Sequence, residues 1–389
     1  VNWTRRTTNL SNTTFPAQLL NDIAMFSATE GWAIGDGGII YRTTDGGGSW
    51  SFQLRGINES GFNVDINSIH FINATRGWAV GPNTSPLGSV FLTTSDGGIN
   101  WTRQAAPASF TPTLNSVFFS DANNGWAVGT SGRCARTING GSTWISVAMP
   151  ATATFTLYSV QFRDANNGYI VGGTTSAGYV MKSTNGGQTW SDPDQIAALP
   201  LFDVKNLDAT TAVTVGNNGT IYRTSDNGAS WDVRTAPPGA LRPLRGLSVV
   251  GNTLFAAGDT VVIVSTNGGV NWTRRTTNLS NTTFPAQTLN DIAMATATHG
   301  WAVGDGGLIY NTRDGGNTWT FQRSPYPTTN INAISYVQGL AYFTGTTGTT
   351  GRNSTPVISS VRVDERGIPQ VFNLAQNYPN PFNPSTTIE

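Results

Sequence analysis

The side chains that most often carry catalysis are scarce in this chain of 389 residues. Two histidines, one cysteine and four glutamates are present, and only two of the glutamates, Glu30 and Glu59, lie before residue 360. A histidine-rich metal site, a Ser-His-Asp triad or a Cys-His pair would therefore have few residues to use. We predict no catalytic residues, no metal site and no cofactor. Loop aspartates and carbonyls could still hold a calcium ion, although no EF-hand spacing is present.

The histidines and the cysteine have structural interpretations. His70 stands between Ile69 and Phe71 in an alternating strand pattern, so we expect a satisfied structural histidine. His299 falls in a turn and is expected to face solvent. Cys134 is expected to be a buried, small apolar residue on a strand.

Most remaining polar residues of chemical interest belong to one recurring turn. A short carboxylate or amide in such a turn can accept backbone N–H bonds, and glycine can adopt a positive φ. Asparagine does the same work but cannot replace an ionised acid in catalysis, so the exchange of Asp for Asn between copies favours a structural role. The motif positions are Asp45, Trp50, Asp96, Trp101, Asn139, Trp144, Asn185, Trp190, Asp226, Trp231, Asn267, Trp272, Asp314 and Trp319.

These turns are spaced as the units of a repeat fold. Successive motif tryptophans lie 41 to 51 residues apart, and residues 1–18 recur without change at 270–287. Each unit contains four short apolar segments, the second of which is bounded by glycines, as in 31–35 and 125–129. A period of this length is typical of one four-stranded β-propeller blade. The sequence therefore predicts an all-β propeller.

The strand count predicts how the ring closes. Seven units run from 19 to about 323, followed by a first strand at 331–337, a second at 341–345 and a third within 352–360. The missing fourth strand is available at residues 2–6, so pairing the chain ends would complete an eighth blade and remove open edges. We predict eight blades closed in this way, with seven as the alternative.

Charge and hydropathy exclude some partners. Lysine plus arginine and aspartate plus glutamate number 22 each, which gives no general field for nucleic acid or an anionic membrane. No apolar run approaches the 18 or so residues of a membrane helix. We predict no nucleic-acid partner and no membrane insertion.

The recurring turns resemble the Asp-box, written roughly Ser/Thr-x-Asp-x-Gly-x-Thr-Trp, of sialidases, sortilin-like receptors and the photosystem II assembly factor-like propellers. The last of these families is similar to nearly all of residues 1–345, through GWAVGDGGLIYNTRDGGNTW at 300–319 and its relatives. A sialidase-like activity would imply three arginines around a carboxylate, a tyrosine paired with a glutamate, and an acid/base aspartate. With so few glutamates, catalytic carboxylates would come mainly from turns, and we predict that the chain is not an enzyme.

The carboxyl end carries a different signal. FNLAQNYPNPFNPSTTIE, from Phe372, resembles the opening of the C-terminal sorting domain of type IX secretion in Bacteroidetes-related bacteria. The resemblance implies export across the outer membrane, followed by release or surface attachment. We predict a propeller over 1–360 and, over 361–389, a linker with the truncated start of a sorting domain.

Function is expected in loops that vary between units, since propellers host unrelated roles on one scaffold. The blade junctions and the connections between second and third strands vary most, and they supply the candidate binding residues Asp36, Arg55, Arg242, Arg245 and Asp305. We predict a secreted or cell-surface, non-catalytic module that binds protein or glycan on the face formed by these variable loops. The alternatives are a sialidase-like or other polysaccharide-acting enzyme, and a self-assembling subunit of a surface layer or filament.

Overall fold

The computed structural model describes residues 3–5, 20–52, 66–275, 288–323 and 330–353, apart from short breaks within these ranges. The chain divides after Val357 into two units. The segment predicted to be a linker and sorting-domain start lies outside the described residues.

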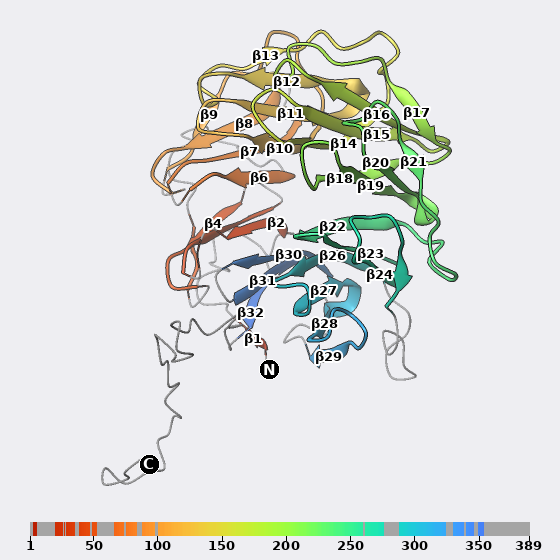
Figure 1. The fold of residues 1–389 in the computed structure, drawn as a ribbon. Coiled ribbons are helices and arrows are strands. Elements are labelled where there is room, and N and C mark those ends of the chain that lie inside the picture. Colours follow the sequence, from red (N-terminus) through yellow and green to blue (C-terminus); the bar gives the residue numbers. More distant parts are fainter. Residues whose placement is uncertain are drawn as a thin grey trace, which may run out of the picture. The chain divides into compact units, whose positions relative to one another are not determined.

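The described elements are β-strands and three short 3-10 turns, so the expected all-β fold is confirmed. In the described part of the chain, no helix is long and apolar enough to cross a membrane. The strands form four-stranded antiparallel sheets (Figure 1).

Seven sheets are each built from four consecutive strands. The first four are β2 (Leu20–Met25), β3 (Gly31–Gly35), β4 (Ile40–Thr43), β5 (Ser51–Phe52); β6 (Ser68–Phe71), β7 (Gly77–Asn83), β8 (Ser89–Thr94), β9 (Thr102–Gln104); β10 (Leu114–Phe119), β11 (Gly125–Gly129), β12 (Cys134–Thr137), β13 (Ile145–Ser146); and β14 (Thr156–Phe162), β15 (Gly168–Thr174), β16 (Ala177–Ser183), β17 (Asp194–Ala197).

The next three are β18 (Leu201–Asn206), β19 (Ala212–Gly216), β20 (Ile221–Thr224), β21 (Asp232–Val233); β22 (Leu244–Val250), β23 (Thr253–Gly258), β24 (Val261–Ser265), β25 (Thr273–Arg274); and β26 (Leu289–Met294), β27 (Gly300–Gly304), β28 (Leu308–Thr312), β29 (Thr320–Arg323). The 3-10 turns η2 (Thr130–Gly132), η3 (Asn217–Gly219) and η4 (Asp305–Gly307) join second to third strands in three of the sheets.

An eighth sheet combines the two ends of the unit. Its order is β1 (Trp3–Arg5), β32 (Thr349–Asn353), β31 (Leu340–Gly345) and β30 (Ile331–Val337). Thr4 lies opposite Arg352 in the antiparallel β1–β32 pair. The expected pairing of the chain ends is therefore present, and the described strands form eight sheets. The third strand was predicted too late, within 352–360, because the β31–β32 connection is shorter than expected.

The first strands of successive sheets contact one another in order, from β2 through β26 to β30 and back to β2, which closes a ring. Apolar clusters fill the space between neighbouring sheets, as where Trp126 of β11 stacks on Phe162 of β14 with ring centroids 3.5 Å apart. The second strands β3, β11, β19 and β27 are buried at every position, as their continuous apolar pattern predicts.

Glycine at the start of a second strand has a steric cause. A Cβ on Gly125 would lie 2.3 Å from the Phe119 ring of the paired first strand. That ring stacks on Trp78 of the preceding sheet at 3.5 Å. The glycine thus leaves room for the aromatic ring that joins the two sheets.

Candidate functional site

The recurring turn after each third strand is held by its own acid or amide. Asp314 Oδ1 accepts hydrogen bonds from the Thr318 N–H at 2.9 Å and the Thr312 hydroxyl at 2.9 Å, and its Oδ2 accepts from the Thr318 hydroxyl at 2.7 Å. In Asn139 the carbonyl oxygen takes the first two roles, and the amide instead donates to the Thr143 hydroxyl at 2.9 Å. The hydroxyl reverses its direction, so both residue types close the same turn.

Hydrogen bonding also sets the acidity of these turn residues. The Ser230 hydroxyl, and after it the Ser230 backbone N–H, lower the pKa of Asp226 far below its ordinary value. An acid with so low a pKa stays ionised and cannot supply a proton near neutral pH.

The same turns receive hydrogen bonds from the preceding sheet. Trp32 Nε1 donates to the Gly97 carbonyl at 2.7 Å, Trp78 to Gly140 at 2.8 Å and Trp126 to Gly186 at 2.9 Å. These second-strand tryptophans are buried, and each donates to a motif glycine of the next sheet along the ring. The turn motif therefore joins neighbouring sheets as well as closing its own.

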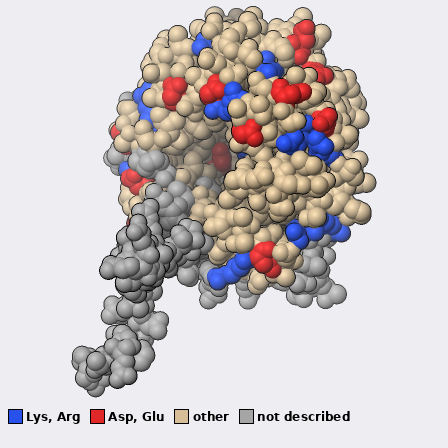
Figure 2. All heavy atoms as spheres, viewed as in Figure 1, with Lys and Arg blue, Asp and Glu red and all other residues tan. Residues whose placement is uncertain are grey.

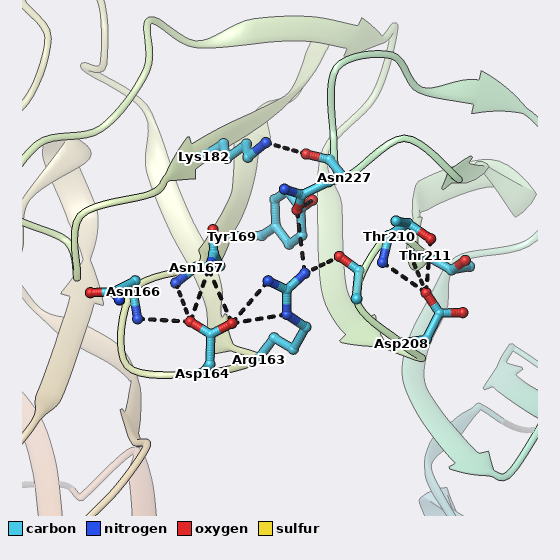
Figure 3. Close-up of polar contacts among 11 residues, drawn as sticks. Arg163, Asp164, Asn166, Asn167, Tyr169, Lys182, Asp208, Thr210, Thr211 and Asn227 are labelled. Carbon is cyan, nitrogen blue, oxygen red and sulfur yellow. Dashed lines mark hydrogen bonds and ion pairs between the residues drawn. The ribbon is translucent and has the colours of Figure 1, made fainter.

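Where the second strand lacks tryptophan, other side chains make the connection (Figure 3). Tyr169 donates its hydroxyl to Asn227 Oδ1 at 3.3 Å, and Lys182 donates to the Asn227 carbonyl. Arg163 pairs with Asp164 at 2.9 Å and also donates to the Ala209 carbonyl of the next sheet. Hydrogen bonds from these side chains therefore join the β14–β17 sheet to the β18–β21 sheet.

Three aspartates lie instead on the first strands, at one repeat position. Asp22 accepts the Ile69 N–H at 3.2 Å, Asp203 accepts the Leu247 N–H at 3.2 Å, and Asp291 accepts the Ile334 N–H at 2.9 Å. Each donor belongs to the first strand of the next sheet, so these carboxylates connect the ring where the first strands meet. Ser68 and Ser116 accept equivalent N–H groups at the same position, from Val117 and Val160.

Sequence reasoning missed this ring of carboxylates because it assigned most aspartates to turns. Aligning the first strands, LNDIAM at 20–25 and 289–294 with LFDVKN at 201–206, was the signal available. Burial raises the pKa of Asp22 to about 7, with a smaller contribution from the charge of Asp291. Burial likewise raises the pKa of Asp291 to about 6. Lys205 forms an ion pair with Asp203 at 3.2 Å.

One residue earlier in the first strands, five asparagines form a second connection. Their side-chain amides donate to a first-strand or adjoining carbonyl of the next sheet at 2.8 to 3.0 Å: Asn21 to Ile66, Asn67 to Leu114, Asn115 to Leu157, Asn290 to Ile331 and Asn332 to Leu20. The last of these crosses from the C-terminal to the N-terminal part of the unit. It repeats at the closure the contact used within the ring.

The predicted binding residues are only partly described. Asp36 and Arg55 lie outside the described residues. Arg242 and Arg245 are exposed near the entry to β22, and Arg245 lies 3.6 Å from Asp259. Asp305, in η4, accepts a hydrogen bond from Asn290 at 2.9 Å and is half-buried. Arg242 thus lies on the connection before β22 and Arg245 at the start of β22, whereas Asp305 is bound by the Asn290 amide.

Similarity to a known family agrees with this architecture. The model of the family described as photosynthesis system II assembly factor YCF48 matches residues 6–110 and 107–245, which is more than half of the chain. The chain belongs to the YCF48 family. The expected resemblance to this propeller family is confirmed. No curated protein matches the chain significantly.

Solved YCF48 structures share the fold of this family member. A structure described as YCF48 bound to D1 peptide is 18% identical, covers 91% of this chain and 96% of its own, and has a TM-score of 0.59. YCF48 from Cyanidioschyzon merolae is 19% identical, with coverages of 90% and 98% and a TM-score of 0.55. The computationally designed Ika8 protein is 10% identical, with coverages of 88% and 97% and a TM-score of 0.66.

Nucleophile and metal chemistry find little support in the described part of this YCF48-family chain. Burial lowers the pKa of His70 to about 4 and raises the pKa of Cys134 to about 12, so both groups are neutral near pH 7. His299, expected to face solvent, is half-buried beside the Trp301 ring, and burial lowers its pKa. Among the described residues, no three His, Cys, Asp or Glu side chains are grouped to hold a metal ion.

Charged groups on the visible face alternate in sign. Figure 2 shows lysine and arginine interspersed with aspartate and glutamate, without a large field of one sign. Recognition by this face would depend on local side chains rather than on long-range attraction.

Proposed function

We propose that the chain is a non-catalytic binding module that recognises a segment of another protein. Membership of the YCF48 family carries the proposal, because a solved YCF48 structure is described as bound to D1 peptide. The turn-face chemistry adds support. Hydrogen bonds within and between sheets involve the motif acids and amides, the second-strand tryptophans and the first-strand aspartates. Recognition of a partner would therefore fall to exposed loop residues.

The enzyme alternative has less support. Among the carboxylates that the structure describes, Asp22 and Asp291 have the pKa values nearest neutrality, as a general acid would require. Both are half-buried and accept backbone N–H groups from neighbouring first strands, which suits a connecting role. Polysaccharide cleavage would need a further pair of accessible carboxylates.

We also propose that the protein works outside the cell, released or held at the outer surface. The sequence from Phe372 supports this part of the proposal through its resemblance to a type IX sorting signal. Attaching residues 361–389 to a reporter in a bacterium with type IX secretion, and assaying the medium and cell surface, tests it. Retention of the reporter inside the cell would refute this part.

The binding proposal is tested by screening the purified full chain. A displayed library of 15-residue peptides and a glycan array are probed in parallel, and turnover of fluorogenic glycosides is measured. We expect peptide ligands and no turnover. Glycan binding without peptide binding would replace the ligand class, and turnover would replace the proposal with an enzyme.

A further inference from the structure

The position of the five connecting asparagines differs in three consecutive sheets. Tyr158 in β14, Phe202 in β18 and Arg245 in β22 occupy it, each at the register shift of its first strand. The asparagines of the other five sheets stand at the same place. Because asparagine satisfies the architecture elsewhere, the ring does not need two aromatic residues and a cation here.

The two aromatic residues form a contact of their own. The Tyr158 and Phe202 rings lie 5.4 Å apart at 77°, an edge-to-face arrangement, and both residues are half-buried. Edge-to-face packing presents a partly open aromatic surface against which a further ring or apolar chain can pack.

The next sheet carries charged groups at and near the same repeat position. The Arg245 guanidinium lies 3.6 Å from Asp259 Oδ1, which is buried yet accepts no hydrogen bond from a described residue. Arg242, three residues before Arg245, is exposed and forms no ion pair with any described residue. Arg245 thus stands beside one acid, and Arg242 adds a second exposed cation three residues earlier along the chain.

We propose that Tyr158, Phe202, Arg242, Arg245 and Asp259 form a recognition arc for an extended peptide. The peptide carries an aromatic or large apolar side chain for the Tyr158–Phe202 pair and, nearby, a carboxylate for the surplus arginine. Asp259 pairs with the Arg245 guanidinium and so helps to hold it at this position. This inference rests on the proposed function and names the segment chemistry that the module would select.

The architecture provides a substitution that removes the arc without damaging the ring. In Tyr158→Asn, Phe202→Asn and Arg245→Asn, the new amide occupies the place from which Asn115 donates to Leu157. By the same geometry the three amides would reach the carbonyls of Leu201, Leu244 and Leu289. We expect the triple variant to melt at or above the temperature of the parent.

Binding is measured by fluorescence anisotropy with labelled peptides of sequence GSGFSEGSG. Phenylalanine and glutamate two positions apart lie on one face of an extended chain, about 7 Å apart. We expect the parent to bind this peptide about tenfold more tightly than matched peptides with serine for phenylalanine or glutamine for glutamate. The triple variant should lose this preference.

A matched control uses an asparagine that is engaged in the ring. Asn67→Ser removes the 2.8 Å bond to the Leu114 carbonyl, so it should lower the melting temperature and leave peptide binding unchanged. Equal binding by the parent and the folded triple variant, or no preference by the parent, would overturn the arc. If library peptides bind the parent and the triple variant alike, the arc fails while the proposed function stands. If no peptide binds at all, both fail.

Discussion

Aspartate and asparagine can replace each other in the recurring turn, because the side chain is needed there as a hydrogen-bond acceptor and its charge is not. Asp314 and Asn139 each accept an N–H from four residues further along and a hydroxyl from two residues before. The only difference is the direction of the bond to the hydroxyl at the end of the turn. The mixture of Asp and Asn at this position favoured such a role in the sequence, because an amide can substitute for an acceptor but not for an acid.

The turn therefore predicts the outcome of a simple exchange. Asn139→Asp should change the melting temperature little, because the Thr143 hydroxyl can turn to donate to the new carboxylate. Asn139→Ala should cost about 1 kcal/mol, since several hydrogen bonds are lost together. Thermal unfolding of both variants checks this. A larger loss for Asp than for Ala would contradict the interpretation.

The raised pKa values of Asp22 and Asp291 predict that folding stability falls as pH rises, which is opposite to the effect of an ordinary ion pair. The folded-state pKa of Asp22, about 7, is above its ordinary value of 3.8. The folded protein therefore binds more protons than the unfolded chain between these values, and stability falls as pH rises from about 4 to about 7. Asp291 contributes in the same direction up to about pH 6.

Asp22→Asn isolates this effect. Asp22 accepts the Ile23 N–H with Oδ1 and the Ile69 N–H with Oδ2, so the single amide oxygen can keep one of these bonds but not both. The amide does not titrate, and we therefore expect the variant to show a shallower decline in stability than the parent between pH 4 and 7. Urea unfolding across this range measures it. A parent whose stability rises from pH 5 to 7 more steeply than the variant would be evidence against the raised pKa.

At the scale of the element, the first and second strands join the sheets, whereas the fourth strands are short. Second strands were predictable from sequence because continuous apolar runs between glycines indicate burial on both faces. The first-strand connections were not, since they depend on a register shift at Asn21 and its counterparts that re-aims the side chains. Such an irregularity leaves no periodic signal. Of the residues in the proposed recognition arc, the sequence analysis named Arg242 and Arg245 but not Tyr158, Phe202 and Asp259, because a half-buried position gives no sign of a binding role.

The second-strand tryptophans should contribute more to the free energy of unfolding than the burial of their apolar surface alone, because they also donate a hydrogen bond. Trp126→Phe keeps a ring against Phe162 but removes the donor to the Gly186 carbonyl. We expect a loss of about 1–2 kcal/mol beyond that caused by the smaller ring. Trp101→Phe is the control, because Trp101 is buried and its Nε1 has no partner among the described residues. Equal losses of unfolding free energy would mean that the inter-sheet hydrogen bond contributes nothing.

At the scale of the whole propeller unit, the chain ends provide one fourth strand. Thr4 and Arg352 lie directly opposite each other, and the sole native cysteine, Cys134, is buried. The double variant Thr4→Cys, Arg352→Cys should therefore form an intramolecular disulfide under mild oxidation. We expect a higher melting temperature by about 5 °C or more, since the bond closes a very long loop.

Each single-cysteine variant serves as the reference, and non-reducing electrophoresis with mass spectrometry identifies the cross-link. Failure of the pair to react in the folded monomer would contradict the pairing of β1 with β32. Cross-linked dimers in place of monomers would mean that the strand is shared between molecules.

The separation of β1 from β32 along the chain also sets an order of assembly. Seven sheets need only neighbouring strands and can form as successive portions of polypeptide become available, whereas the pair at Thr4 and Arg352 must wait for both. Contacts so distant along the chain carry the greatest loop-closure entropy and slow the final step of folding. Until that step, an incomplete sheet exposes a strand edge. The β1–β32 pair is thus the place where the newly synthesised protein most readily misassembles and where the folded protein should open first.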